Sequence, residues 1–114
     1  MDEISALLLT KALDGLALRA TAISQNIANA NSPSYRPLRV TFEQQLRKAA
    51  DQGPEAVRAV HPEYIRTAAE ENNQELRLDL EMASASQTAL RYAALIDVLN
   101  RQMQLNRLIV KGGQ

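Results

Sequence analysis

The sequence contains no cysteine and no tryptophan, and it has one phenylalanine and four glycines among its 114 residues. Without cysteine there is no disulfide framework and no thiolate-ligated metal. Aromatic side chains make up only 4% of the chain, so the large rings that dominate most globular cores are scarce. The apolar content is instead mostly alanine and leucine, which suits close packing between helices.

Further absences exclude whole classes of function. Basic and acidic side chains balance at 13 each, so no excess of positive charge favours nucleic acid. The chain has no glycine-rich phosphate loop and no Gly-x-Ser-x-Gly sequence. His61 is the only histidine, and its place beside Pro62 predicts an ordinary loop residue. We therefore expect no enzymatic activity, no cofactor, no metal, no nucleic acid and no small-molecule substrate.

The chain also lacks membrane and secretory signals. No apolar run approaches the roughly 18 residues that a membrane span needs. The start, Met1-Asp2-Glu3, is acidic and does not provide the basic region of a secretory signal peptide. If the protein leaves the cytoplasm, we expect export without a cleaved signal peptide.

A long helix is predicted from about residue 3 to residue 30. Its apolar residues recur in alternating steps of three and four, which is the heptad seam of a coiled-coil helix. Asp2 is placed to cap the start, and Pro33 after an Asn-rich stretch predicts a firm stop. The predicted seam residues are Ala6, Leu9, Leu13, Leu16, Ala20, Ile23, Ile27 and Ala30.

A second long helix is predicted from about residue 75 to residue 110. Asn72 or Asn73 is placed to cap its start, and the pair Gly112-Gly113 ends it. Acidic residues near the start and basic residues near the end suit the helix dipole. The predicted seam residues are Leu78, Met82, Ala85, Ala89, Tyr92, Ile96, Leu99, Met103, Asn106 and Val110.

The middle of the chain, residues 36–73, is broken up by prolines and a glycine. We expect extended backbone at residues 40–42, a short helix at 43–50 and short strands within 57–67. The predicted fold class is all-α: two long terminal helices packed as an antiparallel coiled-coil pair, with a small irregular insertion between them. Residues 1–35, 36–73 and 74–114 are the three parts of this one core unit.

Both helices carry more apolar residues than a single seam uses. A helix that contacts several neighbours buries such a surplus, so the pattern indicates a protein that assembles and whose isolated form has weak helicity and flexible ends. Four basic residues form a modest cluster, which we interpret as a solvated face or as salt-bridge partners for a neighbouring subunit. The surplus residues are Leu7, Leu8, Ala12, Ala17, Leu18 and Ala22, then Leu90, Leu95, Leu105, Leu108 and Ile109; the basic ones are Arg36, Arg39, Arg47 and Lys48.

The end of the first helix carries a recognisable motif. Residues 26–35 read Asn-Ile-Ala-Asn-Ala-Asn-Ser-Pro-Ser-Tyr, which resembles the signature of flagellar axial proteins. Ser32 stands in place of the usual Thr and Ser34 in place of the usual Gly, and Ser resists the positive φ that Gly permits. Residues 40–46, 73–82, 89–92 and 111–113 are also similar to flagellar basal-body rod proteins. The motif residues that we single out are Asn26, Asn29, Asn31, Pro33 and Tyr35.

The resemblance implies a structural subunit that is exported by the flagellar type III apparatus and polymerises helically into the rod, the drive shaft that crosses the periplasm. The implied partners are other rod subunits and copies of the chain itself, the rod-base adaptor protein and the membrane ring. Phe42 and Leu46 match a Phe-x-x-x-apolar element that meets the export gate in similar subunits; ordinary helix packing is the other interpretation. The implied assembly residues are Leu9, Leu13, Leu16, Ala20, Ile23 and Ile27 in the first helix, and Leu78, Met82, Tyr92, Ile96, Leu99 and Met103 in the second.

A different class of protein fits the same heptads. A soluble coiled-coil adaptor or chaperone that never enters a filament also carries long amphipathic helices. A stable, discrete dimer in solution favours that alternative over a rod subunit.

Overall fold

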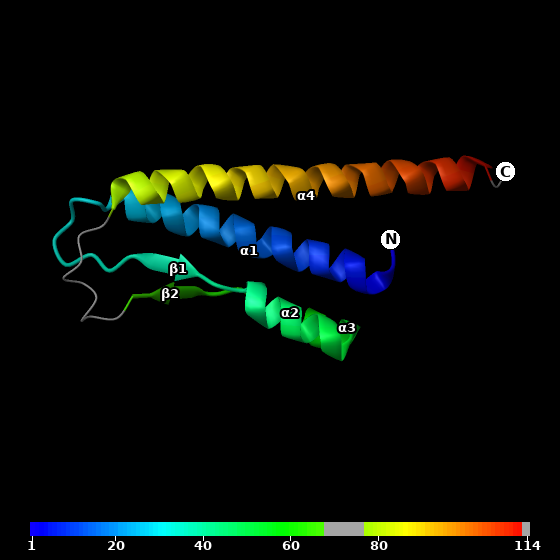
Figure 1. The fold of residues 1–114 in the computed structure, drawn as a ribbon, viewed down its shortest axis with the longest axis horizontal. Coiled ribbons are helices and arrows are strands. Elements are labelled where there is room, and N and C mark those ends of the chain that lie inside the picture. The colour runs from blue at the N-terminus through cyan, green and yellow to red at the C-terminus, as the bar shows by residue number, and fades with distance from the viewer. Residues whose placement is uncertain (68–76, 113–114) are drawn as a thin grey trace.

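The computed structural model describes residues 1–67 and 77–112 of the chain. The molecule is elongated, with extents of 63 × 28 × 14 Å. Helix α1 (Glu3–Ala28) lies between helix α4 (Leu78–Gly112) on one side and the middle segment on the other (Figure 1). The two helices run antiparallel, which confirms the predicted pair of long terminal helices with a small insertion between them.

The ends of α1 follow from local hydrogen bonds. Asp2 caps the start, because its carboxylate accepts a hydrogen bond from the backbone N–H of Ser5 at 2.8 Å. Hydrogen bonding to Ser5, through its side chain first and its backbone N–H second, holds the pKa of Asp2 below its usual value. The helix ends at Ala28, two residues earlier than predicted, and the N–H of Asn29 closes the last turn on the carbonyl of Gln25.

The hydrophobic core lies between α1 and the middle segment. Of the seam residues predicted for α1, Leu9, Leu16 and Ile23 are buried at a spacing of seven, whereas Ala20 is exposed. Strand β1 (Leu38–Val40), helix α2 (Glu43–Gln52) and helix α3 (Pro54–Arg58) cover the other side of α1. The middle segment contributes to the core the side chains of Leu38, Val40, Phe42, Leu46, Ala49, Val57 and Val60.

This arrangement corrects one expectation about α1. Its surplus apolar residues Leu7, Leu8, Ala12 and Leu18 pack against the core, and Ala22 is part of it. The middle segment of the same chain therefore covers part of this surface. Ala17, which also belongs to the surplus, is exposed.

The middle segment combines a short hairpin with two short helices. Strand β1 pairs antiparallel with β2 (Tyr64–Arg66), with Arg39 opposite Ile65. The predicted short helix is confirmed as α2, and β2 lies inside the range in which strands were expected. Val57 and Arg58 lie in α3 rather than in a strand, because Gly53 turns the chain with a φ of 110° and Pro54 then starts a new helix.

Gly15 has a packing reason inside α1. A β-carbon at this position lies 2.4 Å from two ring atoms of Phe42, well inside van der Waals contact. A helix interior ordinarily favours Ala over Gly by about 1 kcal/mol. Here the glycine lets the Phe42 ring lie directly on the α1 backbone, which brings α2 close to α1.

The face of α4 that packs on α1 differs from the predicted seam. Glu81 and Thr88 are buried there and Leu95 is half-buried, while Met82 and Met103, both predicted seam residues, are exposed. Apolar residues occur all round α4, so their spacing does not by itself select one face. The predicted cap residues Asn72 and Asn73, and also Gly113, lie outside the described residues.

Neither α1 nor any other helix within residues 1–67 and 77–112 combines the length and the apolar character that crossing a membrane requires.

Candidate functional site

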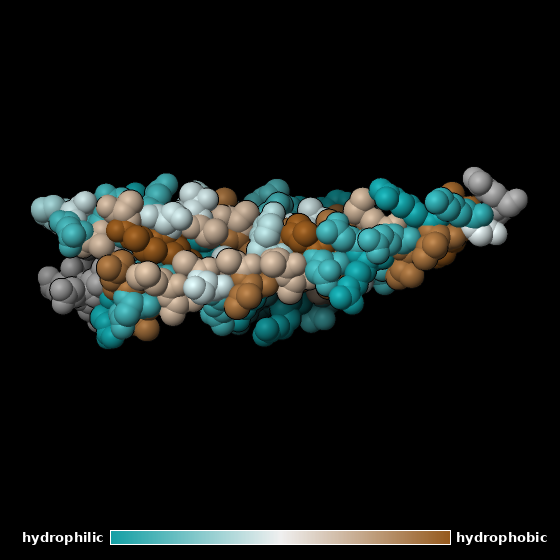
Figure 2. Space-filling view, turned by 90° about the horizontal axis from the view of Figure 1, so that it is seen from above, coloured by the Kyte–Doolittle hydropathy of each residue, from teal (hydrophilic) through white to brown (hydrophobic). Residues whose placement is uncertain are grey.

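Exposed apolar side chains occur along the whole length of α4. Monomeric proteins seldom leave so many large apolar groups in contact with water on one element. Figure 2 looks down on the molecule from the side of α4 and shows apolar patches among polar side chains, with an apolar edge toward the C-terminal end. We call these residues the α4 apolar surface: Leu78, Leu80, Met82, Leu90, Tyr92, Val98, Met103, Leu105, Leu108, Ile109 and Val110.

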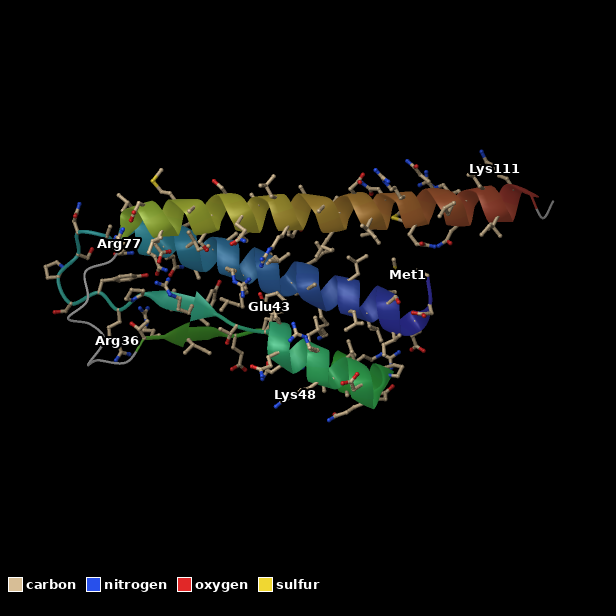
Figure 3. All side chains as sticks on the ribbon, viewed as in Figure 1. Met1, Arg36, Glu43, Lys48, Arg77 and Lys111 are labelled. Carbon is tan, nitrogen blue, oxygen red and sulfur yellow. The ribbon has the colours of Figure 1, made fainter. Side chains whose placement is uncertain are left out.

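The last part of α4 extends beyond the start of α1. The helix has 35 residues and α1 has 26. In Figure 3, Met1 lies partway along α4, and Lys111 lies well beyond it. Residues 103–112 are all exposed, and the exposed fraction of Ile109 reaches 71%. The apolar residues at this end of the helix therefore have no cover from residues 1–67, the rest of the chain that the structure describes.

The residues predicted to mediate assembly separate into two groups. In α1, Leu9, Leu16 and Ile23 are buried in the chain's own core, Leu13 and Ile27 are half-buried, and Ala20 is exposed. In α4, Leu78, Met82, Tyr92 and Met103 are exposed, whereas Ile96 and Leu99 are half-buried. Apolar surface that remains available to a partner is thus concentrated on α4.

Asn26, the first residue of the turn motif, is fully buried and joins three elements. Its Oδ1 accepts hydrogen bonds from the Tyr35 hydroxyl and from the Leu38 N–H, each at 2.8 Å. Its Nδ2 donates to the Leu38 carbonyl at 2.9 Å and to Glu81 Oε2 at 3.2 Å. All hydrogen-bonding positions that a buried amide must satisfy are filled, so the residue links α1, β1 and α4 without an unpaired polar atom.

The rest of the motif forms the turn that leaves α1. The Asn29 side chain donates to the Gln25 carbonyl at 2.9 Å, and its Oδ1 accepts from the Ser32 hydroxyl at 3.2 Å. Asn31 and Pro33 are exposed, and the guanidinium of Arg66 lies over the Tyr35 ring at 5.8 Å. The chain turns with Ser34 at a φ of 61°, in the left-handed region where related motifs place glycine.

An ion pair between a buried carboxylate and a half-exposed guanidinium adjoins Asn26. Glu81 is 5% exposed, and its Oε1 lies 2.7 Å from a guanidinium nitrogen of Arg39 on β1. Arg39 therefore has a salt-bridge partner in its own chain, while nearly half of its side chain stays exposed to solvent, as expected for a solvated face. This role could not be predicted from the sequence, because Glu81 stands among exposed apolar residues at a helix start, where an acidic residue is already favoured by the dipole.

A second polar contact joins α1 to the start of α2. The Arg19 guanidinium donates to both carboxylate oxygens of Glu43, at 2.8 and 2.7 Å, and to the Val40 carbonyl at 2.6 Å. It also lies over the Phe42 ring, 5.1 Å from the centroid. The hydrogen bonds from Arg19 lower the pKa of Glu43 to about 2. In Figure 3, Glu43 lies at the junction between the hairpin and α2, facing α1.

Phe42 and Leu46 are core residues in this structure. Their exposed fractions are 4% and 8%, and both line one end of a groove of about 470 Å³ between α1, α2 and α4. Their spacing of four is that of one face of α2 directed at α1, which is the packing interpretation of the motif. In the folded chain they are not available to an export gate.

The chain is similar along nearly its whole length to a protein of Bacillus subtilis (strain 168). In an alignment of 123 positions, that relative is 24% identical to this chain. The alignment covers 93% of this chain and 92% of the relative, which is named flagellar basal body rod protein FlgB. The chain resembles FlgB. The FlgB of Borrelia hermsii is 43% identical over 47 residues, which cover 41% of this chain and 35% of that FlgB. No protein-family model matches the chain. The similarity to FlgB confirms the resemblance to flagellar rod proteins that the motif residues indicated.

Proposed function

We propose that this chain is a structural subunit of the bacterial flagellar basal-body rod and not an enzyme. The observation that carries the proposal is the similarity to FlgB of Bacillus subtilis, which spans more than nine tenths of both chains and therefore includes both long helices. The elongated shape and the α4 apolar surface support it, because a subunit of a tube needs apolar surface to bury against its neighbours.

Within the rod, the chain belongs to the proximal part. Its partners are other rod subunits and copies of itself in a helical assembly, the rod-base adaptor protein and the membrane ring. Torque passes along the antiparallel α1–α4 pair, which consists of the two longest helices in the described residues. Burial of a leucine or isoleucine stabilises by roughly 1.5–3 kcal/mol, so contacts with neighbours offset the entropy cost of ordering the uncovered end of α4.

Export precedes assembly in this proposal and uses the flagellar type III apparatus without a cleaved signal peptide. Phe42 and Leu46 are buried in the folded chain, so an export gate that binds them must meet the chain before it folds. Folding is then completed when the subunit is added to the growing rod. The same two residues would serve twice, first as an exposed element and later as part of the core.

The first experiment is an immunoblot of purified hook–basal bodies from source cells that carry a tagged copy of the chain. Co-purification through detergent and high salt, with loss of rods when the gene is deleted, is the expected result. A protein found only in the cytosol, with intact rods after deletion, contradicts the proposal and favours the soluble coiled-coil adaptor or chaperone.

A further inference from the structure

The contact between Asn26 and Glu81 fixes which residues of α1 and α4 lie opposite each other. In an antiparallel pair, moving along one helix means moving back along the other, so Leu16 is expected opposite Arg91 and Ala12 opposite Leu95. These four residues do line the same groove, which agrees with this register. By the same rule Glu3 lies opposite Gln104, and residues 105–112 extend roughly 12 Å beyond α1.

Apolar packing alone discriminates poorly between registers of this pair. A heptad repeat places equivalent residues opposite each other after a slip of seven residues, a displacement of about 10 Å. The face of α4 toward α1 is only weakly apolar, since its buried positions include Glu81 and Thr88. A slip by one heptad brings Thr88 opposite Asn26 and shortens the projecting end of α4 by seven residues.

The polar contacts do discriminate between registers. Glu81 is buried and meets two partners in the observed register, the Asn26 amide and the Arg39 guanidinium. After a slip by one heptad, Glu81 lies opposite residue 33, beyond the end of α1, and loses both the hydrogen bond from Asn26 and the ion pair with Arg39. Asn26 itself stays bound to Leu38 and Tyr35. Its side chain therefore keeps one position on α1 and β1, whatever the register of α4.

We infer that Asn26, Glu81 and Arg39 form a polar lock that sets the register of α4 on α1, and so determines how far residues 105–112 project. Single buried polar residues fix the register of other coiled coils in the same way. These three residues act as positioning residues, because none of them belongs to the α4 apolar surface that they place. The lock itself is a property of the single chain. Only its consequence for assembly rests on the proposed function.

The test measures the register directly in the isolated full chain. Because the sequence has no cysteine, single spin labels can be attached at Thr21→Cys and Asn100→Cys, two exposed positions on α1 and α4. Pulsed electron paramagnetic resonance should give one narrow distance for the chain with Glu81 intact. The Glu81→Leu variant should add a second population displaced by about 10 Å, the length of one heptad.

Two matched variants make the result specific. Glu81→Gln keeps a hydrogen-bond acceptor for Asn26 and should keep the single distance. Asp79→Leu makes the same chemical change in the same turn, at an exposed carboxylate outside the lock, and should also keep it. A single unshifted distance in folded Glu81→Leu overturns the lock, whether or not the chain enters rods.

If Glu81→Leu does not fold, a second pair of variants tests whether the polar lock sets the register of α4. Asn26→Asp places two carboxylates together and should lose the single distance. Adding Glu81→Gln supplies an amide donor to the new carboxylate and should recover both the helical circular dichroism and the single distance. Failure of Glu81→Gln to improve Asn26→Asp in either measurement overturns the lock.

Discussion

At the residue scale, Ser34 is held in a backbone conformation that its side chain disfavours. Its φ of 61° lies in the left-handed region, which costs an ordinary residue about 1–2 kcal/mol. Glycine avoids that cost but loses more entropy on folding, by about 0.5–1 kcal/mol. We expect Ser34→Gly to raise the free energy of unfolding by about 0.5–1 kcal/mol, measured by urea denaturation followed by circular dichroism.

Ser32→Gly is the matched control for this prediction. Ser32 has no positive φ, and its hydroxyl donates to Asn29, so glycine there should lower the free energy of unfolding by about 0.5–1 kcal/mol. If Ser34→Gly destabilises the chain as much as Ser32→Gly does, the strain argument is wrong.

Gly15 illustrates what a sequence can say about one residue and what it cannot. From the sequence, a glycine inside a predicted helix is a weak point that alanine would improve. The structure gives the opposite preference, because the Phe42 ring occupies the place of a side chain. This contact joins residues 27 positions apart and depends on the path of the middle segment, which local propensity does not encode.

At the scale of the elements, the two long helices were predictable to different degrees. The buried face of α1 could be predicted from apolar spacing, because Leu9, Leu16 and Ile23 recur every seven residues and are all buried. The α4 face did not, since apolar residues surround that helix and the position of Glu81 is set by Asn26 and Arg39. The contacts of Glu81 with Asn26 and Arg39 place this part of α4 against α1 and β1. Hydrophobic periodicity contains no information about contacts between polar side chains.

The joint between α1 and α2 should depend on pH through Glu43. Its pKa in the folded chain is about 2, below the ordinary value of 4.5, because Arg19 hydrogen bonds to the carboxylate. A lowered folded-state pKa means that the contribution to stability is complete above about pH 4.5 and is lost as the pH falls toward 2. Nearly half of the side chain is exposed, so we expect a loss of no more than about 1 kcal/mol.

Urea denaturation between pH 5 and pH 2.5 measures this loss. Glu43→Gln should have a flatter dependence of the unfolding free energy on pH than the unaltered chain, because it has no proton to gain. Asp51→Asn, at an exposed carboxylate on the same helix, is the control and should leave the Arg19–Glu43 contribution in place. Identical pH profiles for Glu43→Gln and the unaltered chain would show that the pair contributes nothing.

At the scale of the whole molecule, α1 is covered on two sides, by α4 and by the middle segment, whereas α4 is covered mainly on the side that faces α1. The middle segment covers one side of α1 and α4 covers another, so the leucine and isoleucine side chains of α1 are all buried or half-buried. The sequence predicted two apolar helices and surplus apolar surface, but not that the insertion would cover one of them. Long-range packing of residues 38–60 against α1 determines that α1, and not α4, is covered by the insertion. As a result, most of the exposed large apolar side chains among the described residues lie on α4 and not on α1.

The uncovered end of α4 therefore gives the sharpest test of assembly. Leu108 and Ile109 are 65% and 71% exposed, so replacing them removes few packing contacts from the isolated chain. The double substitution Leu108→Glu with Ile109→Glu should change the unfolding free energy of the isolated chain by no more than about 0.5 kcal/mol. In cells it should reduce incorporation into rods at least tenfold, because two charges would have to be buried against the neighbouring subunit.

The control adds the same charge without removing apolar surface. Gln104→Glu with Asn106→Glu places two glutamates on the same end of the helix, at exposed polar positions, and leaves the apolar residues unchanged. Immunoblots of purified hook–basal bodies should detect this variant close to the unaltered level. Because net charge is equal in the two variants, only loss of the apolar contact separates them. Equal incorporation of both would mean that residues 105–112 do not face a neighbour, and that the subunit assembles through the upstream part of α4.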